Sequence, residues 1–158
     1  MEPIIHNTFV IERNYAAAPE KVFEAFADPA KKRRWYVEGG GHEVEQYDMD
    51  FRPGGRECAR FHFAKDTGYP VAGMECVNVS NYEDIVPGRR IVFSNSMSIG
   101  GKFVSATLAT VEFVPKGTGT DLVFTHQGVF TEGSGGAAMR ERGWCTLFDR
   151  LMAALQGS

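Results

Sequence analysis

Between His42 and Phe130, apolar and polar residues alternate with a period of two, and glycine-rich turns divide the alternation into short segments. A period of two sends successive side chains to opposite faces of a β-strand. Glycine ends such segments because it adopts turn conformations that other residues avoid. One such turn at residues 39–41 precedes the stretch, and others within it lie at 53–55, 100–101 and 117–119. The pattern predicts an antiparallel meander, in which consecutive strands pair.

The alternation places an unusually aromatic set of side chains on one face of the predicted sheet. In "EQYDMDFRPGG", Tyr47, Met49 and Phe51 share one phase. The later segments contribute Phe61, Phe63, Ile91, Phe93, Asn95, Met97, Thr107, Val111, Phe113, Leu122, Phe124 and His126. Removing such a face from water requires a second layer of structure. We therefore expect a helix to cover this side of the sheet.

Two short helices are predicted after a first strand in "TFVIERNYA". Pro19 suits a first helical position, and the apolar residues of "KVFEAF" form one face. Asp28 and Pro29 are expected to end the first helix and to cap the second. The basic run at residues 31–34 is interpreted as the solvated face of a helix.

The last helix is predicted over "RERGWCTLFDRLMAAL", residues 140–155. Its apolar stripe at helical spacing consists of Trp144, Leu147, Phe148, Leu151 and Leu155. The charged residues Arg140, Glu141, Arg142, Asp149 and Arg150 are expected mostly elsewhere around the helix. A single helix laid across a strongly curved sheet leaves part of the interior unfilled. We therefore expect a hollow that the large aromatic residues of the stripe cover.

Composition limits the classes of protein to consider. A chain of 158 residues with 43% hydrophobic residues can form one core, so residues 1–158 are expected to be a single domain. The net charge of −3 disfavours nucleic acid as a partner, because that binding needs a broad basic surface. No apolar stretch is long enough for a membrane span, and the N-terminus lacks the layout of a secretory signal. Three cysteines without a CxxC pair fit a reducing compartment, so we expect a cytoplasmic protein.

The order of the segments resembles a known superfamily. After the first strand and two short helices come "DFRPGG", "YEDIVPGRRIVFS", "ATVEF", "GTDLVFTHQGVF" and "RERGWCTLFDRL". This order is similar to the SRPBCC superfamily of START-like, helix-grip domains, in the branch named for the C-terminal domain of the activator of the heat-shock protein ninety ATPase. The resemblance runs from about Thr8 to Leu155. It implies an α+β fold in which a curved antiparallel sheet of about six to seven strands wraps around a long C-terminal helix.

The resemblance also implies a cavity between sheet and helix, which in relatives takes lipids, sterols, polyketides or other apolar molecules. Carried over by position, Trp35 would lie near the mouth of this cavity. The wall would consist of Met49, Phe51, Phe61, Phe93, Met97, Phe113, Phe124, Trp144 and Phe148, with Asn95 and His126 as its polar groups. The alternative is that these aromatic residues fill an ordinary core, which applies to Phe124 more than to Trp35 or Met97.

His126 is the candidate for chemistry. On the inner face of the sheet its imidazole would be neutral, because burial disfavours the charged form, and it could bind a carbonyl group or act as a general base. The alternative is a structural histidine that bonds a neighbouring group. The sequence shows no partner that would orient a catalytic imidazole, which favours the structural role.

Other site chemistries have weaker support in the sequence. The four histidines show no metal-ligand spacing, so no metal site is expected. Cys145 has no recognisable activating base. The segment "GSGGAAMRERG" lacks the lysine and the hydroxyl residue of a phosphate-binding loop. We expect no cofactor.

Three functions from different classes remain open. The first is binding or carriage of an apolar small molecule without catalysis, which the sequence favours. The second is an enzyme of cyclase, dehydratase or hydrolase type, in which His126 moves a proton in the same pocket. The third is a chaperone-associated module, against which stands the absence of the additional N-terminal domain that the eukaryotic regulators carry. A homodimer is plausible for a domain of this size, but no interface is recognisable.

Overall fold

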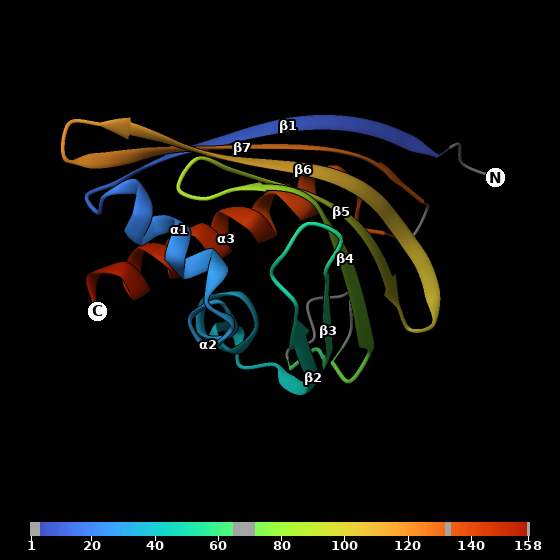
Figure 1. The fold of residues 1–158 in the computed structure, drawn as a ribbon. Helices are drawn as coiled ribbons and strands as arrows, with labels where there is room; N and C mark the ends of the chain where they lie inside the picture. Colours follow the sequence, from blue (N-terminus) through green and yellow to red (C-terminus); the bar gives the residue numbers. More distant parts are fainter. Residues whose placement is uncertain (1–3, 65–71, 132–133, 158) are drawn as a thin grey trace.

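The computed structural model describes residues 4–64, 72–131 and 134–157 (Figure 1). The strands are β1 (Ile5–Tyr15), β2 (Glu43–Met49), β3 (Arg56–His62), β4 (Glu75–Val86), β5 (Arg90–Ile99), β6 (Lys102–Lys116) and β7 (Gly119–Phe130). The helices are α1 (Pro19–Ala27), α2 (Pro29–Lys32) and α3 (Gly136–Gln156), with a π-helical turn η1 (Arg33–Val37) and a 3-10 turn η2 (Glu38–Gly40) after α2. The described elements therefore follow the predicted order of one strand, two short helices, a strand meander and a long final helix.

The seven strands form one antiparallel sheet in the order β1-β7-β6-β5-β4-β3-β2. Strands β2 to β7 pair consecutively, as expected for a meander, and β1 adds to the far side of β7. The sheet is strongly curved, and α3 lies along its concave side (Figure 1). This arrangement confirms the predicted α+β fold with a curved sheet around a C-terminal helix.

Local signals in the sequence place the short helices. Pro19 is the first residue of α1, where its missing N–H loses no hydrogen bond. The Asp28 carboxylate accepts hydrogen bonds from the backbone N–H of Ala30 at 2.9 Å and of Lys31 at 3.2 Å. Asp28 therefore caps α2, as predicted.

Helix α3 begins at Gly136, about one turn before the predicted start. Trp144, Phe148 and Leu151 are its buried residues, and they face the sheet from the predicted stripe. No helix in the described ranges combines the length and the apolar character that crossing a membrane requires.

The described hydrophobic core divides into two clusters. The larger cluster joins α1, η1 and α3 to the inner face of the sheet around Phe113, Leu122 and Phe124. The smaller one contains Cys76, Ile99 and Val104 and lies toward the other end of the sheet. A main core with a smaller satellite cluster is common in a domain of this size.

Candidate functional site: a cavity between the sheet and α3

A cavity of about 690 Å³ lies between the two clusters of the core. Its wall is formed by the inner face of β3 to β7, by α3 and by the chain around η1 and η2. Phe93 and Trp144 of the larger cluster line one part, and Cys76 and Ile99 of the smaller cluster line another. Exposed residues of α3, among them Arg142, Gly143 and Thr146, also line it and mark its solvent side. The volume lies within the range of ordinary small-molecule sites.

Part of the predicted residue set lines this cavity. These residues are Phe61, Phe93, Asn95, Met97, His126 and Trp144. They come from β3, β5, β7 and α3, and the antiparallel register together with the alternation along each strand brings them to one place. The Asn95 amide donates to the side chains of Asn78 and Ser80, so this polar group is already held by β4. Their role in binding stays a prediction.

The other predicted residues lie elsewhere. Phe113, Phe124 and Phe148 are in the larger core cluster under α3, where side chains of the short helices and α3 occupy the available space. Met49 and Phe51 pack against the same cluster from the β2–β3 hairpin. Trp35 is 2% exposed and its indole N–H donates to the Ala25 carbonyl at 2.9 Å, so it joins η1 to α1. Its neighbour Tyr36 lines the cavity instead.

His126 lies on β7 against the cavity, and its side chain is almost fully buried. Its ring stacks on Phe9 of β1 at a centroid distance of 4.5 Å. Burial, and after it the positive charge of Arg140, lowers the pKa of His126 to about 4. The imidazole is therefore neutral near pH 7, as expected, and its buried Nδ1 has no hydrogen-bond partner among the described residues.

Arg140 departs from the expectation for α3. The charged residues of this helix were expected mostly away from the buried stripe, but Arg140 is half-buried and lines the cavity. Its Nη2 donates to Ser105 Oγ at 2.6 Å, and its guanidinium carbon lies 5.3 Å from the centre of the Phe130 ring. Arg140 lies one helical turn before Trp144, so the same face of α3 carries both side chains.

The family of the chain follows from its match to known sequences. A family model described as activator of Hsp90 ATPase homolog 1-like protein matches residues 16–156. The chain belongs to this family. No curated protein matches it.

Solved structures of similar proteins agree in fold with this chain. Protein Mll3558 from Rhizobium loti is 44% identical with a TM-score of 0.84, and the match covers 97% of this chain and 99% of that one. An uncharacterized protein from Rhizobium leguminosarum is 35% identical with a TM-score of 0.87, covering 99% and 98% of the two chains. Protein CV1439 from Chromobacterium violaceum, at 24% identity and a TM-score of 0.71 over 94% and 96%, shares the fold.

A buried ion pair lies behind the Tyr36 wall of the cavity in this family member. Lys32 Nζ contacts Glu57 Oε1 at 2.7 Å, and the two side chains are 5% and 4% exposed. Tyr82 donates to the same Oε1 at 2.9 Å, and Tyr47 donates to Oε2. The Lys32 ammonium also lies 4.7 Å from the centre of the Tyr36 ring. The position of Lys32 corrects the interpretation of the basic run as a solvated face, because α2 directs this residue toward the carboxylate on β3.

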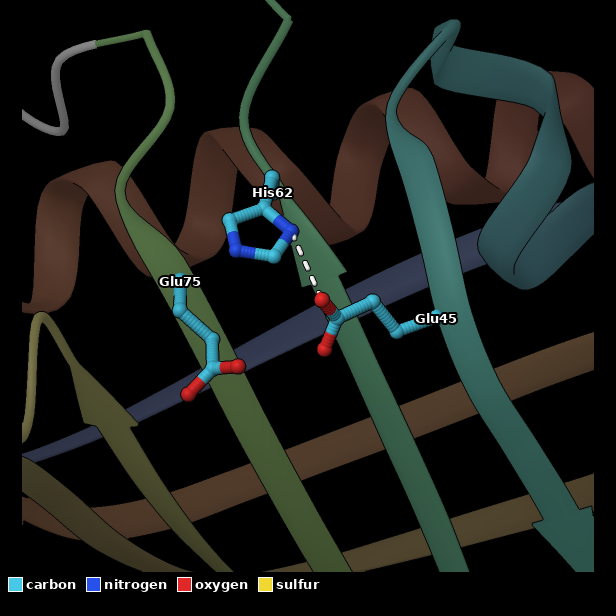
Figure 2. A group of neighbouring side chains, drawn as sticks. All are labelled: Glu45, His62 and Glu75. Carbon is cyan, nitrogen blue, oxygen red and sulfur yellow. Dashed lines mark ion pairs between the residues drawn. The ribbon is translucent and has the colours of Figure 1, made fainter.

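On the outer face of the sheet, Glu45, His62 and Glu75 come close together from β2, β3 and β4 (Figure 2). Their ligand atoms lie within 4.8 Å of one another, and His62 Nδ1 is 3.6 Å from Glu45 Oε1. Sequence spacing did not indicate this cluster, because strand pairing alone joins its members. Arg60 lies 3.4 Å from Glu75 Oε2 and already balances that carboxylate. We therefore assign no metal to the cluster.

Proposed function

We propose that the chain binds an apolar or amphipathic small molecule in the cavity between the sheet and α3. The observation that carries the proposal is a cavity of about 690 Å³ that interrupts the hydrophobic core. Protein interiors are close-packed, and a large apolar hollow without an occupant loses packing energy. The fold of this family commonly takes hydrophobic ligands, which supports the same function.

The glycine at position 143 of α3 is a second observation in favour of a ligand-binding cavity. It lies in the interior of α3, where glycine costs about 1 kcal/mol relative to alanine. It also lines the cavity, and a Cβ added at this position would meet no atom within 4 Å. A larger residue would thus fit the helix and narrow the solvent side of the cavity. A glycine at this place keeps that side open.

Substitution of Gly143 by leucine is expected to weaken binding without weakening the fold. The neutral fluorescent probe N-phenyl-1-naphthylamine is expected to bind the wild type and to lose at least about tenfold in affinity for Gly143→Leu, because leucine narrows the solvent side of the cavity, where the probe enters and is held. The melting temperature should stay or rise, since leucine favours the helix. Ala138→Leu is the matched control, because Ala138 is exposed on α3 and is not among the lining residues. Unchanged probe affinity in Gly143→Leu, or no binding to the wild type, would contradict the proposal.

We also propose that the protein is located in the cytoplasm and that it forms a homodimer. The three cysteines, Cys58, Cys76 and Cys145, are free thiols, which supports a reducing compartment such as the cytoplasm. A homodimer would be consistent with the size of the domain.

An enzyme that uses the same cavity is the second candidate, and the observation that favours it is the neutral imidazole of His126 in the wall. If His126 moves a proton, His126→Gln should stop turnover and leave the unconverted substrate bound. The small molecules that co-purify with the wild type and with His126→Gln should then differ, as extraction and mass spectrometry would show. The same ligand in both proteins argues for binding without catalysis.

A further inference from the structure

The charged groups of the cavity are all basic. Arg140, Arg142 and Arg150 are among the lining residues, and the described lining contains no aspartate or glutamate. The chain as a whole has a net charge of −3, so the cavity opposes the overall charge. A cleft that concentrates one sign of charge favours a ligand of the opposite sign.

Arg140 is half-buried and lacks a carboxylate partner among the described residues. Its polar contacts among the described residues are neutral, namely Ser105 Oγ at 2.6 Å and Met97 Sδ at 3.3 Å. Burial lowers the pKa of Arg140, which reports the loss of water around the guanidinium. A guanidinium has five N–H donors and stays charged, so several donors remain for another group. A half-buried cation without a counter-ion is an incomplete ion pair.

The polar groups near Arg140 can donate hydrogen bonds to the carboxylate of an acidic ligand. Tyr36 accepts a hydrogen bond from the Asn78 amide at 3.3 Å, and its own O–H has no acceptor in the described part of the chain. Burial keeps the pKa of Tyr36 above its ordinary value, so the hydroxyl retains its proton and can donate it in a hydrogen bond. His126 places a neutral ring on the same wall. The remaining lining around these groups is mostly apolar, including Phe61, Ile99 and Trp144.

We propose that the ligand of this cavity is an apolar carboxylic acid, held by an ion pair between its carboxylate and Arg140, with its hydrocarbon body among the aromatic side chains. The inference rests on the proposed function of the cavity and names the class of its ligand. A guanidinium matches the geometry of a carboxylate with two parallel N–H groups. The proposed ion pair involves Arg140 alone, and one guanidinium balances a single negative charge, so the ligand is named as a monoanionic carboxylate.

The test compares an acid with its neutral analogue of the same shape. 2-Naphthoate and 2-naphthamide compete with the neutral probe N-phenyl-1-naphthylamine for the purified full chain. In the wild type, we expect naphthoate to bind at least about tenfold more tightly than naphthamide, because charge-assisted hydrogen bonds are the strong ones. Arg140→Met, which keeps the length of the side chain and removes its charge, should bring the two affinities within about twofold.

Two further variants show whether the preference for the acid comes from the ion pair with Arg140 or from the overall charge of the protein. Arg140→Lys keeps the positive charge but lacks the two parallel N–H groups of a guanidinium, so it should retain part of the preference for the acid. Arg56→Met removes an exposed charge from the outer face of β3 and should leave the preference unchanged. Naphthamide and probe affinities show whether the cavity of Arg140→Met is intact.

The possible outcomes separate this inference from the proposed function. If the probe does not bind the wild type, the proposed function and this inference both fail. If the probe binds but naphthoate and naphthamide compete equally, the cavity binds neutral apolar molecules and only this inference is overturned. A preference for the acid that survives in Arg140→Met would also overturn it.

Discussion

Replacing Glu57 by glutamine is expected to lower the free energy of unfolding by about 3–5 kcal/mol. The substitution leaves the Lys32 ammonium, on a side chain that is 5% exposed, without its carboxylate. The hydroxyl groups of Tyr47 and Tyr82 also lose a charged acceptor. A buried charge without a partner has lost its hydration and gains nothing in return. Equilibrium unfolding in urea would measure the change.

Two comparisons show whether the buried charge is the cause. The double variant Lys32→Met with Glu57→Met should recover part of the lost stability, because it removes the unpaired charge, while the hydroxyl groups of Tyr47 and Tyr82 still lack their acceptor. The surface pair Arg90–Asp84, with an N–O distance of 2.6 Å and side chains 47% and 43% exposed, is the matched control. Asp84→Asn should change stability by no more than about 1 kcal/mol. An effect of Glu57→Gln as small as that of Asp84→Asn would contradict the prediction.

Acidification from pH 6.5 to about 4 is expected to destabilise the fold by about 3 kcal/mol through His126 alone. Burial holds the pKa of this imidazole at about 4 in the folded chain, compared with 6.5 in the unfolded chain. Between these values the unfolded state binds the proton and the folded state does not. Stability is therefore highest above pH 6.5 and falls as the pH drops toward 4. The charged group nearby is Arg140, which opposes a second positive charge.

Carboxylates also titrate toward pH 4, so the contribution of His126 has to be obtained as a difference. The free energy of unfolding is measured between pH 7.5 and 4 for the wild type and for His126→Gln, which has no titrating ring. The wild type should lose more stability across this range than the variant, by about 3 kcal/mol. Parallel curves for the two proteins would show that His126 does not remain neutral in the folded state.

The period-two alternation predicts which side chains lie on the inner face of the sheet, because the direction of a side chain in a strand depends only on its position along that strand. Phe93, Phe113 and Phe124 all lie on the inner face to which their phase assigned them. The Asp28 cap was equally predictable, since a side chain that bonds N–H groups two and three residues ahead needs no distant partner. The apolar stripe of α3 was found for the same reason.

Two charged residues carry sequence signals for a buried position. Glu57 shares the inner phase of β3 with Ala59 and Phe61, and a carboxylate in that position requires a buried cation. Arg140 is four residues before Trp144, so the buried stripe of α3 extends to it. Both signals indicate a polar group inside, although neither identifies Lys32 or the cavity as its surroundings.

The placement of Trp35 and Tyr36 could not be predicted from periodicity. Both lie in the π-helical turn Arg33–Val37, where the rotation per residue differs from that of an α-helix. This local change directs Trp35 to the Ala25 carbonyl in the core, and the cavity is lined by Tyr36. A small difference in backbone rotation therefore decides that Trp35 lies in the core and Tyr36 lines the cavity, instead of the reverse.

Local patterns along the chain specify which strands and helices form, which face of each is apolar and how the domain is layered, because these properties depend on residues near one another in the sequence. The place where the core is interrupted, and the side chains that meet there, depend on the folded arrangement of distant segments. Sheet curvature and the position of α3 set the cavity volume, and they bring Arg140 to His126 and Lys32 to Glu57. These are contacts between residues far apart in sequence, and no local pattern specifies the distance between them.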